Sequence, residues 1–309
     1  MEVLVSGSLA YDRIMDFPGR FSDHIMPDKI HMINLSFTVN GLKENFGGTA
    51  GNIAYSLSLL GETPRIVATI GNDYHRYFQW FEQCGLSTSD IRVVAEESTA
   101  SAYITTDLSD NQITGFNPGA MKQQAVFDFG GIDPRECIAI VAPGNLQDMG
   151  EFTERHRQLG VYSIFDPGQS LPAWEGEDLA NCIAQSNMLV SNDYEFALIK
   201  DKTGKSTEEL VEMVGTVVTT KGEQGAEVLT RLGSIPVPCV PTGNVVDPTG
   251  AGDAFRGGLI KGLVEGSSIE RAVMMGTVCS HYAIQTLGTQ EYSFVPEEFR
   301  AKLAEHFGA

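Results

Sequence analysis

A glycine-rich turn close to the end of the chain carries a carboxylate and runs into an apolar segment. Residues 247–258 read DPTGAGDAFRGG, and the apolar residues that follow recur with helical spacing. The first N–H groups of a helix have no partner within it, so Gly250, Ala251 and Gly252 can form a nest for negative charge. Asp253 beside this nest could accept a hydroxyl proton during phosphoryl transfer. On spacing alone, a glycine-rich turn with a helix-capping aspartate explains the segment equally well.

Two segments near the N-terminus could bind a polar substrate. Asp12 follows the first apolar run, where a carboxylate can accept hydrogen bonds from vicinal hydroxyls of a sugar or ribose. Gly47 and Gly48 allow the backbone to approach a ring closely, and Asn52, one turn into the next helix-like stretch, adds a donor and an acceptor. A capping aspartate and a tight strand-to-helix turn are the alternatives.

The elements that must position these residues alternate between short apolar runs and helix-like stretches. This rhythm predicts an α/β fold with a mostly parallel sheet and helices on both faces. The apolar runs are residues 3–5, 65–70, 138–142, 162–165, 188–190 and 216–219. In such sheets ligands bind at the carboxyl ends of the strands, where glycines or polar residues follow these runs. We therefore expect one crevice to be rimmed by Gly7, Asn145, Asp166, Asn192 and Lys221-Gly222.

Two regions have a different pattern, which predicts a small β-flap that acts as a lid. Apolar and polar residues alternate over residues 33–39, as in half-buried antiparallel strands, and residues 98–116 are rich in Thr and Tyr. We expect insertions at about 13–46 and 96–120 to build this flap, with a pair of decorative surface hairpins as the alternative. Because the chain has neither a repeat nor a linker, residues 1–309 are expected to form a single domain.

The charge balance restricts the partners. Lys and Arg number 21 against 40 Asp and Glu, a net charge of −19, and such a surface repels nucleic-acid phosphates and anionic membranes. We therefore expect a small-molecule partner, without nucleic acid or membrane. An anionic ligand such as ATP would have to be bound by local devices, such as helix N-termini, a magnesium ion and a few lysines.

Cysteine usage and the N-terminus predict a cytoplasmic protein. The five cysteines are scattered and include no C-x-x-C pair, which disfavours a disulfide framework or a zinc site. The first residues lack the positive charge and the apolar stretch of a signal peptide. A complete P-loop motif and a G-x-G-x-x-G after the first strand are also missing from the sequence, which disfavours P-loop and dinucleotide-binding enzymes.

Residues 247–253 resemble, at every position, the carboxy-terminal signature D-[TP]-[TV]-G-A-G-D of the ribokinase-like (PfkB) family of carbohydrate and nucleoside kinases. A second family signature, Gly-Gly followed by a helix that carries an Asn, is matched by residues 47–54. The resemblance extends over essentially the whole chain, from Gly7 to a glycine segment around Gly288. It implies a ribokinase-like fold with a β-flap, and transfer of the ATP γ-phosphate to an alcohol group with Asp253 as the base.

The resemblance also implies how the chain holds its cofactors, ATP and Mg²⁺. Asn192 and Glu195 match an N-x-x-E motif whose implied role is to organise Mg²⁺ through water, although by itself a helix start with a capping Asn is the better explanation. Asp247 is a candidate ligand of a monovalent cation such as K⁺. The residues that match nucleotide-lining segments are Asn192, Thr220, Lys221, Gly222, Gly225, Gly250 and Gly252.

The acceptor is expected to be a nucleoside. Residues 115–121 and 282–290 resemble those of prokaryotic adenosine and nucleoside kinases, and residues 166–169 offer no arginine for a substrate phosphate. Phe37 and Phe116 in the flap could stack on a purine or form the flap's own core. We expect an adenosine kinase acting on the 5′-hydroxyl. A free-sugar kinase of the ribokinase or fructokinase type and a non-catalytic nucleoside-binding protein are the alternatives, and a homodimer paired through the flaps is left open.

Overall fold

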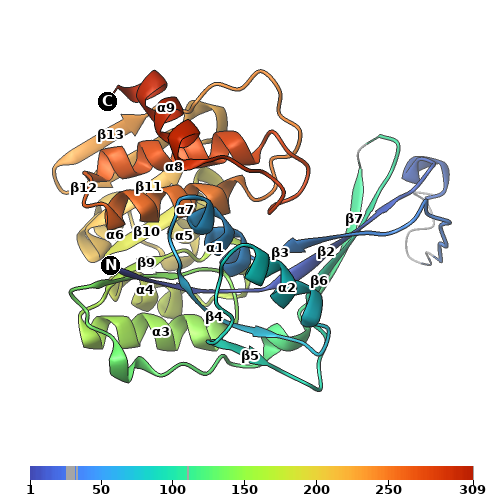
Figure 1. The fold of residues 1–309 in the computed structure, drawn as a ribbon, viewed down its shortest axis with the longest axis horizontal. Coiled ribbons are helices and arrows are strands. Elements are labelled where there is room, and N and C mark those ends of the chain that lie inside the picture. The colour runs from blue at the N-terminus through green and yellow to red at the C-terminus, as the bar shows by residue number, and fades with distance from the viewer. Residues whose placement is uncertain (26–31, 33, 110, 309) are drawn as a thin grey trace.

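A nine-stranded sheet forms the centre of the molecule. Its strands are β1 (Glu2–Ser6), β4 (Arg65–Ile70), β5 (Ile91–Val93), β8 (Cys137–Val141), β9 (Tyr162–Phe165), β10 (Met188–Asn192), β11 (Thr216–Thr220), β12 (Ala226–Thr230) and β13 (Gly233–Val237). Across the sheet the order is β13-β12-β11-β10-β9-β8-β1-β4-β5 (Figure 1). The strands from β11 to β5 run parallel, and β12 and β13 extend one edge antiparallel. The structure is a computed structural model that describes residues 1–25, 32, 34–109 and 111–308.

The predicted α/β fold is confirmed. Each of the six apolar runs forms a strand in the parallel part of the sheet, because strands covered on both faces, such as β8 with all five residues buried, need apolar side chains throughout. The sequence analysis missed β5, which has three residues, and the edge strands β12 and β13, whose sequences AEVLT and GSIPV mix polar and apolar residues.

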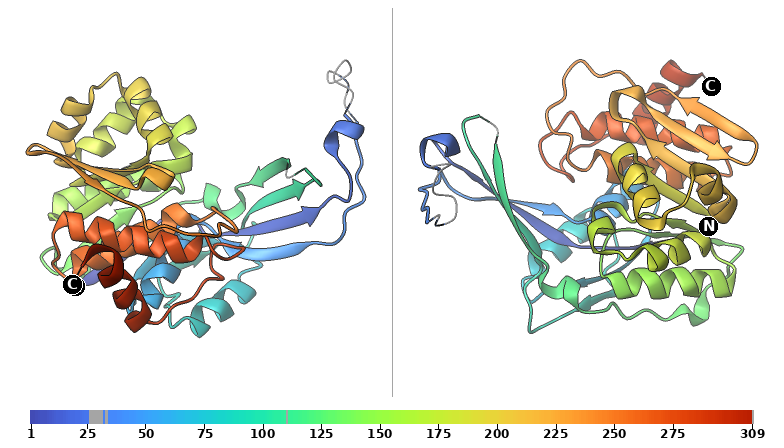
Figure 2. Two further views of the ribbon diagram at one scale, coloured as in Figure 1. Left: turned by 90° about the horizontal axis from the view of Figure 1, so that it is seen from above. Right: turned by 180° about the vertical axis from the view of Figure 1, so that it is seen from behind.

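Helices cover both faces of the sheet (Figures 1 and 2). One side carries α1 (Thr49–Leu59), α2 (His75–Gln83), α7 (Ala251–Val264) and α8 (Ile269–Ala283), with α9 (Pro296–Phe307) packed on α8. The other side carries α3 (Leu146–Leu159), α4 (Gly176–Ala184), α5 (Asp193–Thr203) and α6 (Thr207–Val214). Each helical layer has its own apolar core against the sheet, so the strand ends are held from two sides.

A second sheet projects from the body (Figure 2). Its strands are β2 (Ala10–Asp16), β3 (Lys43–Gly47), β6 (Ala100–Thr106) and β7 (Gln112–Asn117), in the order β3-β2-β6-β7. The strand predicted at residues 33–39 is wrong for residues 34–39, which have no regular structure, and Ile33 lies outside the described residues. Phe37 packs on other aromatic residues of the flap instead, since its ring lies 4.6 Å from Phe17 and 5.3 Å from Phe21, centroid to centroid.

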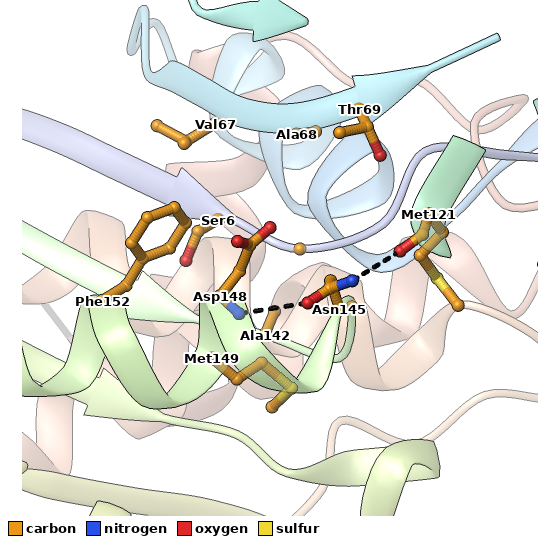
Figure 3. A pocket seen from close by; sticks show the side chains of 12 residues that line it. Ser6, Val67, Ala68, Thr69, Met121, Ala142, Asn145, Asp148, Met149 and Phe152 are labelled. Carbon is orange, nitrogen blue, oxygen red and sulfur yellow. Dashed lines mark hydrogen bonds between the residues drawn. The ribbon is translucent and has the colours of Figure 1, made fainter. Parts of the chain in front are cut away.

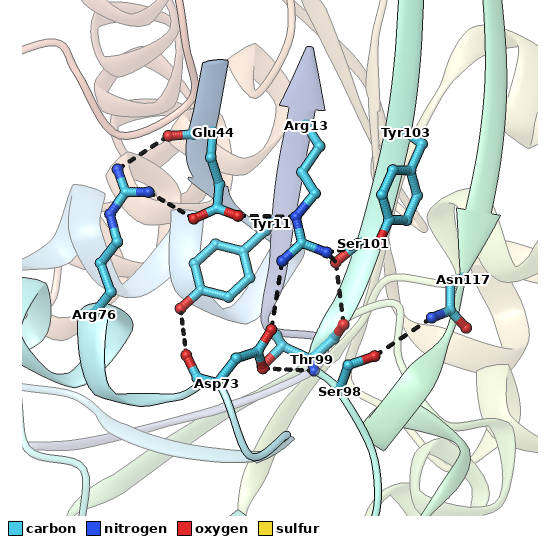
Figure 4. Close-up of polar contacts among 10 residues, drawn as sticks. All are labelled: Tyr11, Arg13, Glu44, Asp73, Arg76, Ser98, Thr99, Ser101, Tyr103 and Asn117. Carbon is cyan, nitrogen blue, oxygen red and sulfur yellow. Dashed lines mark hydrogen bonds and ion pairs between the residues drawn. The ribbon is translucent and has the colours of Figure 1, made fainter. Parts of the chain in front are cut away.

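A polar network on one face of the second sheet joins it to the body (Figure 4). Arg13 donates from Nε to Glu44 Oε2 at 2.8 Å and from Nη1 to the Tyr103 hydroxyl at 2.7 Å, which links three strands. Arg13 Nη2 also lies 3.4 Å from Asp73 Oδ2 in the turn before α2. Side chains alternate along a strand, so Asp12 lies on the face of the second sheet opposite to Arg13. In the part of the chain that the structure describes, no helix is long and apolar enough to cross a membrane.

Candidate active site

A cleft of about 480 Å³ lies between the second sheet and the carboxyl ends of the main-sheet strands. Most of the predicted site residues line it, although they come from segments far apart in the sequence. They are Asp12, Gly48, Asn52, Phe116, Asn192, Glu195, Thr220, Gly222, Gly250, Gly252 and Asp253. Phe116 is 50% exposed, so its ring is accessible from the cleft.

Five predicted residues lie outside the cleft lining: Gly47, Ala251, Lys221, Gly225 and Asp247. The Lys221 ammonium is paired with Glu227 Oε2 at 2.6 Å, and the Ala251 N–H donates to the Pro248 carbonyl at 3.2 Å. Asp247 accepts hydrogen bonds from the backbone N–H groups of Thr249 and Gly288 at 2.9 and 3.1 Å. These residues support the loops that border the cleft.

The expected single crevice is only partly correct, because Gly7 and Asn145 line a separate small cavity (Figure 3). Asn145 Oδ1 accepts the N–H groups of Gln147 and Asp148 at 3.0 and 3.2 Å, which caps the first turn of α3. Its Nδ2 group donates to the Met121 carbonyl at 3.0 Å. The polar residue after β8 is therefore used to cap a helix rather than to bind a ligand in the cleft.

Asp253 lies in the first turn of α7, at the bottom of the cleft. Gly250 precedes this helix with a φ of 78°, a left-handed conformation that glycine adopts without strain. The chain therefore turns sharply before the helix, and the N–H groups of Gly252 and Asp253 are left without partners within the helix. Burial raises the pKa of Asp253 to about 6, while the positive charge of Arg256 and a hydrogen bond from Asn52 lower it. Asp253 is thus suited to be ionised and yet basic near neutral pH.

Arg256 and Asp166 form a buried ion pair beneath this helix start. Arg256 donates from Nε and Nη2 to the two oxygens of Asp166, the second at 2.9 Å, and from Nη1 to the Gly252 carbonyl at 2.9 Å. Their side chains are 7% and 2% exposed, and both residues line the cleft. The sequence analysis gave Arg256 no role. Its position three residues after Asp253, on the same helix face, was the signal that could have revealed it.

Asp12 lies on β2 against the Gly-Gly turn. A side-chain carbon at position 47 would lie 2.6 Å from Asp12 Oδ2, so glycine is required there for the carboxylate to keep its place. Gly48 has a φ of 89°, and a side chain there would meet the Ser8 carbonyl at 2.6 Å. Burial, together with the negative charge of Asp247, raises the pKa of Asp12 to about 6. Asp12 and Asp253 therefore both face the cleft with raised pKa values, from different elements.

Asn192 and Glu195 cap α5 and also line the cleft. Asn192 Oδ1 accepts the Glu195 N–H at 2.7 Å, and Glu195 Oε2 accepts the Asn192 N–H at 2.7 Å. Burial and the charge of Asp166 raise the pKa of Glu195. Carboxylate and amide oxygens are the ligands that Mg²⁺ prefers. The cap uses only Oε2 of Glu195 and one of the two lone pairs of Asn192 Oδ1, so both side chains can still accept hydrogen bonds from metal-bound water. The pair therefore fits a water-mediated magnesium site as well as the helix cap.

Several other residues of the cleft lining were not predicted as site residues, and only Thr49 and Thr249 among them lie within the two signatures. They are Ser8, Thr49, Ala102, Pro143, Gly168, Gln169, Thr249 and Thr289. Thr289 donates to the Phe46 carbonyl at 2.8 Å and so joins the last loop of the site to β3. Small hydroxyl residues of this kind cannot be predicted from sequence spacing, because they come from segments far apart in the sequence that only the fold brings together.

Known proteins share this architecture. The profile of the pfkB family carbohydrate kinases matches residues 10–297. The structure of a Burkholderia thailandensis nucleoside kinase in complex with inosine is 42% identical, with a TM-score of 0.88 over 99% of this chain and 98% of that chain. A Methanocaldococcus jannaschii nucleoside kinase is 29% identical over 259 residues, which cover 83% of this chain and 85% of the relative. The chain therefore belongs to the pfkB family of carbohydrate kinases and is a phosphotransferase that acts on an alcohol group.

Proposed function

We propose that this protein is an ATP-dependent nucleoside kinase that phosphorylates the 5′-hydroxyl of purine nucleosides. The observation that carries the proposal is the position of Asp253 at the start of α7, in the same cleft as Asp12, Asn52 and Phe116. The similarity to nucleoside kinases supports it, including a Burkholderia thailandensis structure in complex with ADP-inosine at 43% identity.

In the proposed reaction, Asp253 accepts the proton of the acceptor hydroxyl as the hydroxyl oxygen attacks the γ-phosphorus of ATP. The bond from oxygen to phosphorus forms, the bond from the γ-phosphorus to the β-γ bridging oxygen breaks, and ADP leaves. The N–H groups of Gly252 and Asp253 face the negative charge of the transferred group. When bound, Mg²⁺ neutralises charge on the phosphate oxygens, and Asn192 and Glu195 are the residues that would hold its waters.

On the acceptor side, Asp12 receives the ribose hydroxyls and Phe116 contacts the base. A carboxylate is a suitable acceptor for two vicinal hydroxyls, and the exposed Phe116 ring on β7 of the same sheet offers a stacking surface. Stacking tolerates changes at the edge of the base, so adenosine, the acceptor favoured by the sequence, and inosine are both proposed substrates.

The second sheet is proposed to act as the lid. It carries Asp12, Ala102 and Phe116 on the wall of the cleft, and it contains parts of both predicted insertions, 13–46 and 96–120. Transfer to a hydroxyl has to outcompete transfer to water, which closure over the acceptor would exclude.

The test of the function is the rate of ADP release with magnesium and ATP across adenosine, inosine, ribose and fructose. Nucleosides should be turned over with a kcat/KM at least about tenfold above the free sugars, since the base adds contacts. Turnover of ribose or fructose alone would support a sugar kinase instead. No turnover with any acceptor would support a non-catalytic binding protein.

A further inference from the structure

A chain of three hydrogen bonds runs from the apolar core to Asp253. The indole Nε1 of Trp80 donates to Gln290 Oε1 at 2.8 Å, and Gln290 Nε2 donates to Asn52 Oδ1 at 2.9 Å. Asn52 Nδ2 then donates to Asp253 Oδ2 at 2.8 Å. Gln290 is 1% exposed and Asn52 is 5% exposed, so water does not compete freely for these bonds.

The chemistry of Trp80 fixes which atom donates and which accepts in all three hydrogen bonds. An indole N–H can only donate, so the oxygen of the Gln290 amide must face Trp80 and its NH₂ group must face Asn52. The second hydrogen of that NH₂ group is directed at the Tyr77 hydroxyl, 2.9 Å away, which donates its own hydrogen to the Gly47 carbonyl at 2.6 Å. Each donor therefore meets an acceptor, and reversal of either amide would place like atoms together.

We propose that Gln290 and Trp80 are positioning residues, which hold the Asn52 amide with its NH₂ group toward Asp253 Oδ2 and so leave Oδ1 as the atom that receives the substrate proton. This inference rests on the proposed kinase function and adds to it two residues outside the cleft lining. The two amides, Asn52 and Gln290, lie 238 positions apart in the sequence.

The orientation of Asn52 decides how easily Asp253 gives up its proton. An N–H donor favours the carboxylate form, whereas an amide oxygen in the same place would favour the protonated acid. The other charged groups that act on Asp253 are Arg256, Asp166 and Asp12. All three are retained in both test variants. Trp80→Phe adds no charge, so a change in the titration of Asp253 in that variant would report on the amide, whereas Gln290→Glu also adds a negative charge that raises the pKa of Asp253 directly.

The test is the pH dependence of kcat in Gln290→Glu and Trp80→Phe. The introduced carboxylate has no N–H for Asn52 Oδ1, so Asn52 should reverse, and loss of the indole donor should allow the same reversal. We expect the kcat midpoint to rise by about one to two pH units in Gln290→Glu and less in Trp80→Phe. Near pH 7 this corresponds to a loss of about two- to tenfold, most of which should return above about pH 9, with KM for ATP unchanged.

The matched control is Tyr55→Phe. Tyr55 stacks on Trp80 and donates a buried hydrogen bond to the Tyr292 carbonyl, outside the chain that ends at Asp253. This variant should lose stability and keep the wild-type midpoint. A midpoint within about 0.3 pH units of wild type in Trp80→Phe, the variant that adds no charge, would overturn the proposal.

If a variant does not fold, the orientation of Asn52 can still be tested by NMR on the wild-type protein. The NMR signals of the Asn52 side-chain NH₂ group should titrate with the same midpoint as Asp253, and a signal that does not respond to pH would overturn the proposal. This experiment needs no turnover. If the wild-type protein phosphorylated no nucleoside, the function proposed above would fail. The titration would still decide whether the Asn52 NH₂ group faces Asp253, and its change in Trp80→Phe would decide whether Trp80 and Gln290 hold it there.

Discussion

Asp12 and Asp253 face the same cleft with similar pKa values, and the proposed mechanism gives them different roles because different elements hold them. Asp253 lies at a helix N-terminus and is bonded to Asn52, where negative charge is stabilised and a transferred phosphoryl group can be held. Asp12 lies on a strand of the second sheet, against Gly47, where hydroxyl groups of an acceptor can reach it. Residue type alone therefore does not distinguish the base from the binding group.

Asp253→Asn should abolish most turnover and spare ATP binding. The amide nearly preserves the shape of the carboxylate but cannot take the hydroxyl proton. Loss of a general base lowers kcat by roughly 10² to 10⁴-fold. Steady-state kinetics, with ATP binding measured by calorimetry, check this prediction, and a variant that keeps more than about a tenth of the wild-type kcat would exclude Asp253 as the base.

Asp12→Asn should weaken nucleoside binding and change the pH profile. A hydrogen bond to a charged group contributes about 1.5 to 3 kcal/mol, so nucleoside KM should rise at least about tenfold while ATP KM stays constant. Both carboxylates have a pKa of about 6, and both must be ionised in the free enzyme.

As pH falls through this value, log kcat/KM for the nucleoside should therefore drop with a slope approaching 2 in wild type and 1 in Asp12→Asn. An unchanged slope in Asp12→Asn, together with a normal nucleoside KM, would assign Asp12 to another role.

At the scale of elements, the buried pair of Arg256 and Asp166 fastens α7 to the end of β9. Removing one partner of a buried ion pair costs about 3 to 5 kcal/mol, because the other charge is left uncompensated. Asp166→Asn should therefore lower the free energy of unfolding by about this amount, as measured by urea denaturation. The exposed pair of Arg135 and Asp133 provides the control, since Asp133→Asn should have no measurable effect. Equal stability of the two variants would contradict this account of the pair.

The sequence predicts elements better than it predicts contacts between them. The parallel strands could be predicted because burial on both faces requires continuous apolar runs, and the start of α7 could be predicted because its glycines precede helical spacing. The alternating sequence of residues 34–39 resembles that of a strand, but the segment has no regular structure. Phe37 packs against Phe17 and Phe21 instead of facing a neighbouring strand. Arg256 with Asp166 could not be paired from the sequence, because no local pattern links residues 90 positions apart.

For the whole molecule, an acidic chain has to bind a highly anionic cofactor. With a net charge of −19, its overall field opposes ATP, and Lys221 and Arg256 are already paired with carboxylates. In the proposed mechanism, the helix start at Gly252 and Asp253 and a magnesium ion held through Asn192 and Glu195 would offset this field locally.

The proposed lid should close when a nucleoside binds. Amide hydrogen exchange in β2, β3, β6 and β7 should slow at saturating inosine, because closure buries their backbone groups against the body. The edge strands β12 and β13 carry no residue of the cleft lining and should exchange as before. Unchanged protection of the second sheet with a demonstrated substrate would end the lid proposal.

Transfer of the γ-phosphate to a nucleoside is tested most directly by the identity of the product. In a ³¹P NMR time course with magnesium, ATP and inosine, we predict that nucleoside 5′-monophosphate and ADP appear in equal amounts, with little inorganic phosphate. Asp253→Asn should form neither at a comparable rate. Formation of ADP with inorganic phosphate but without a nucleoside monophosphate, in the wild-type protein, would contradict the account.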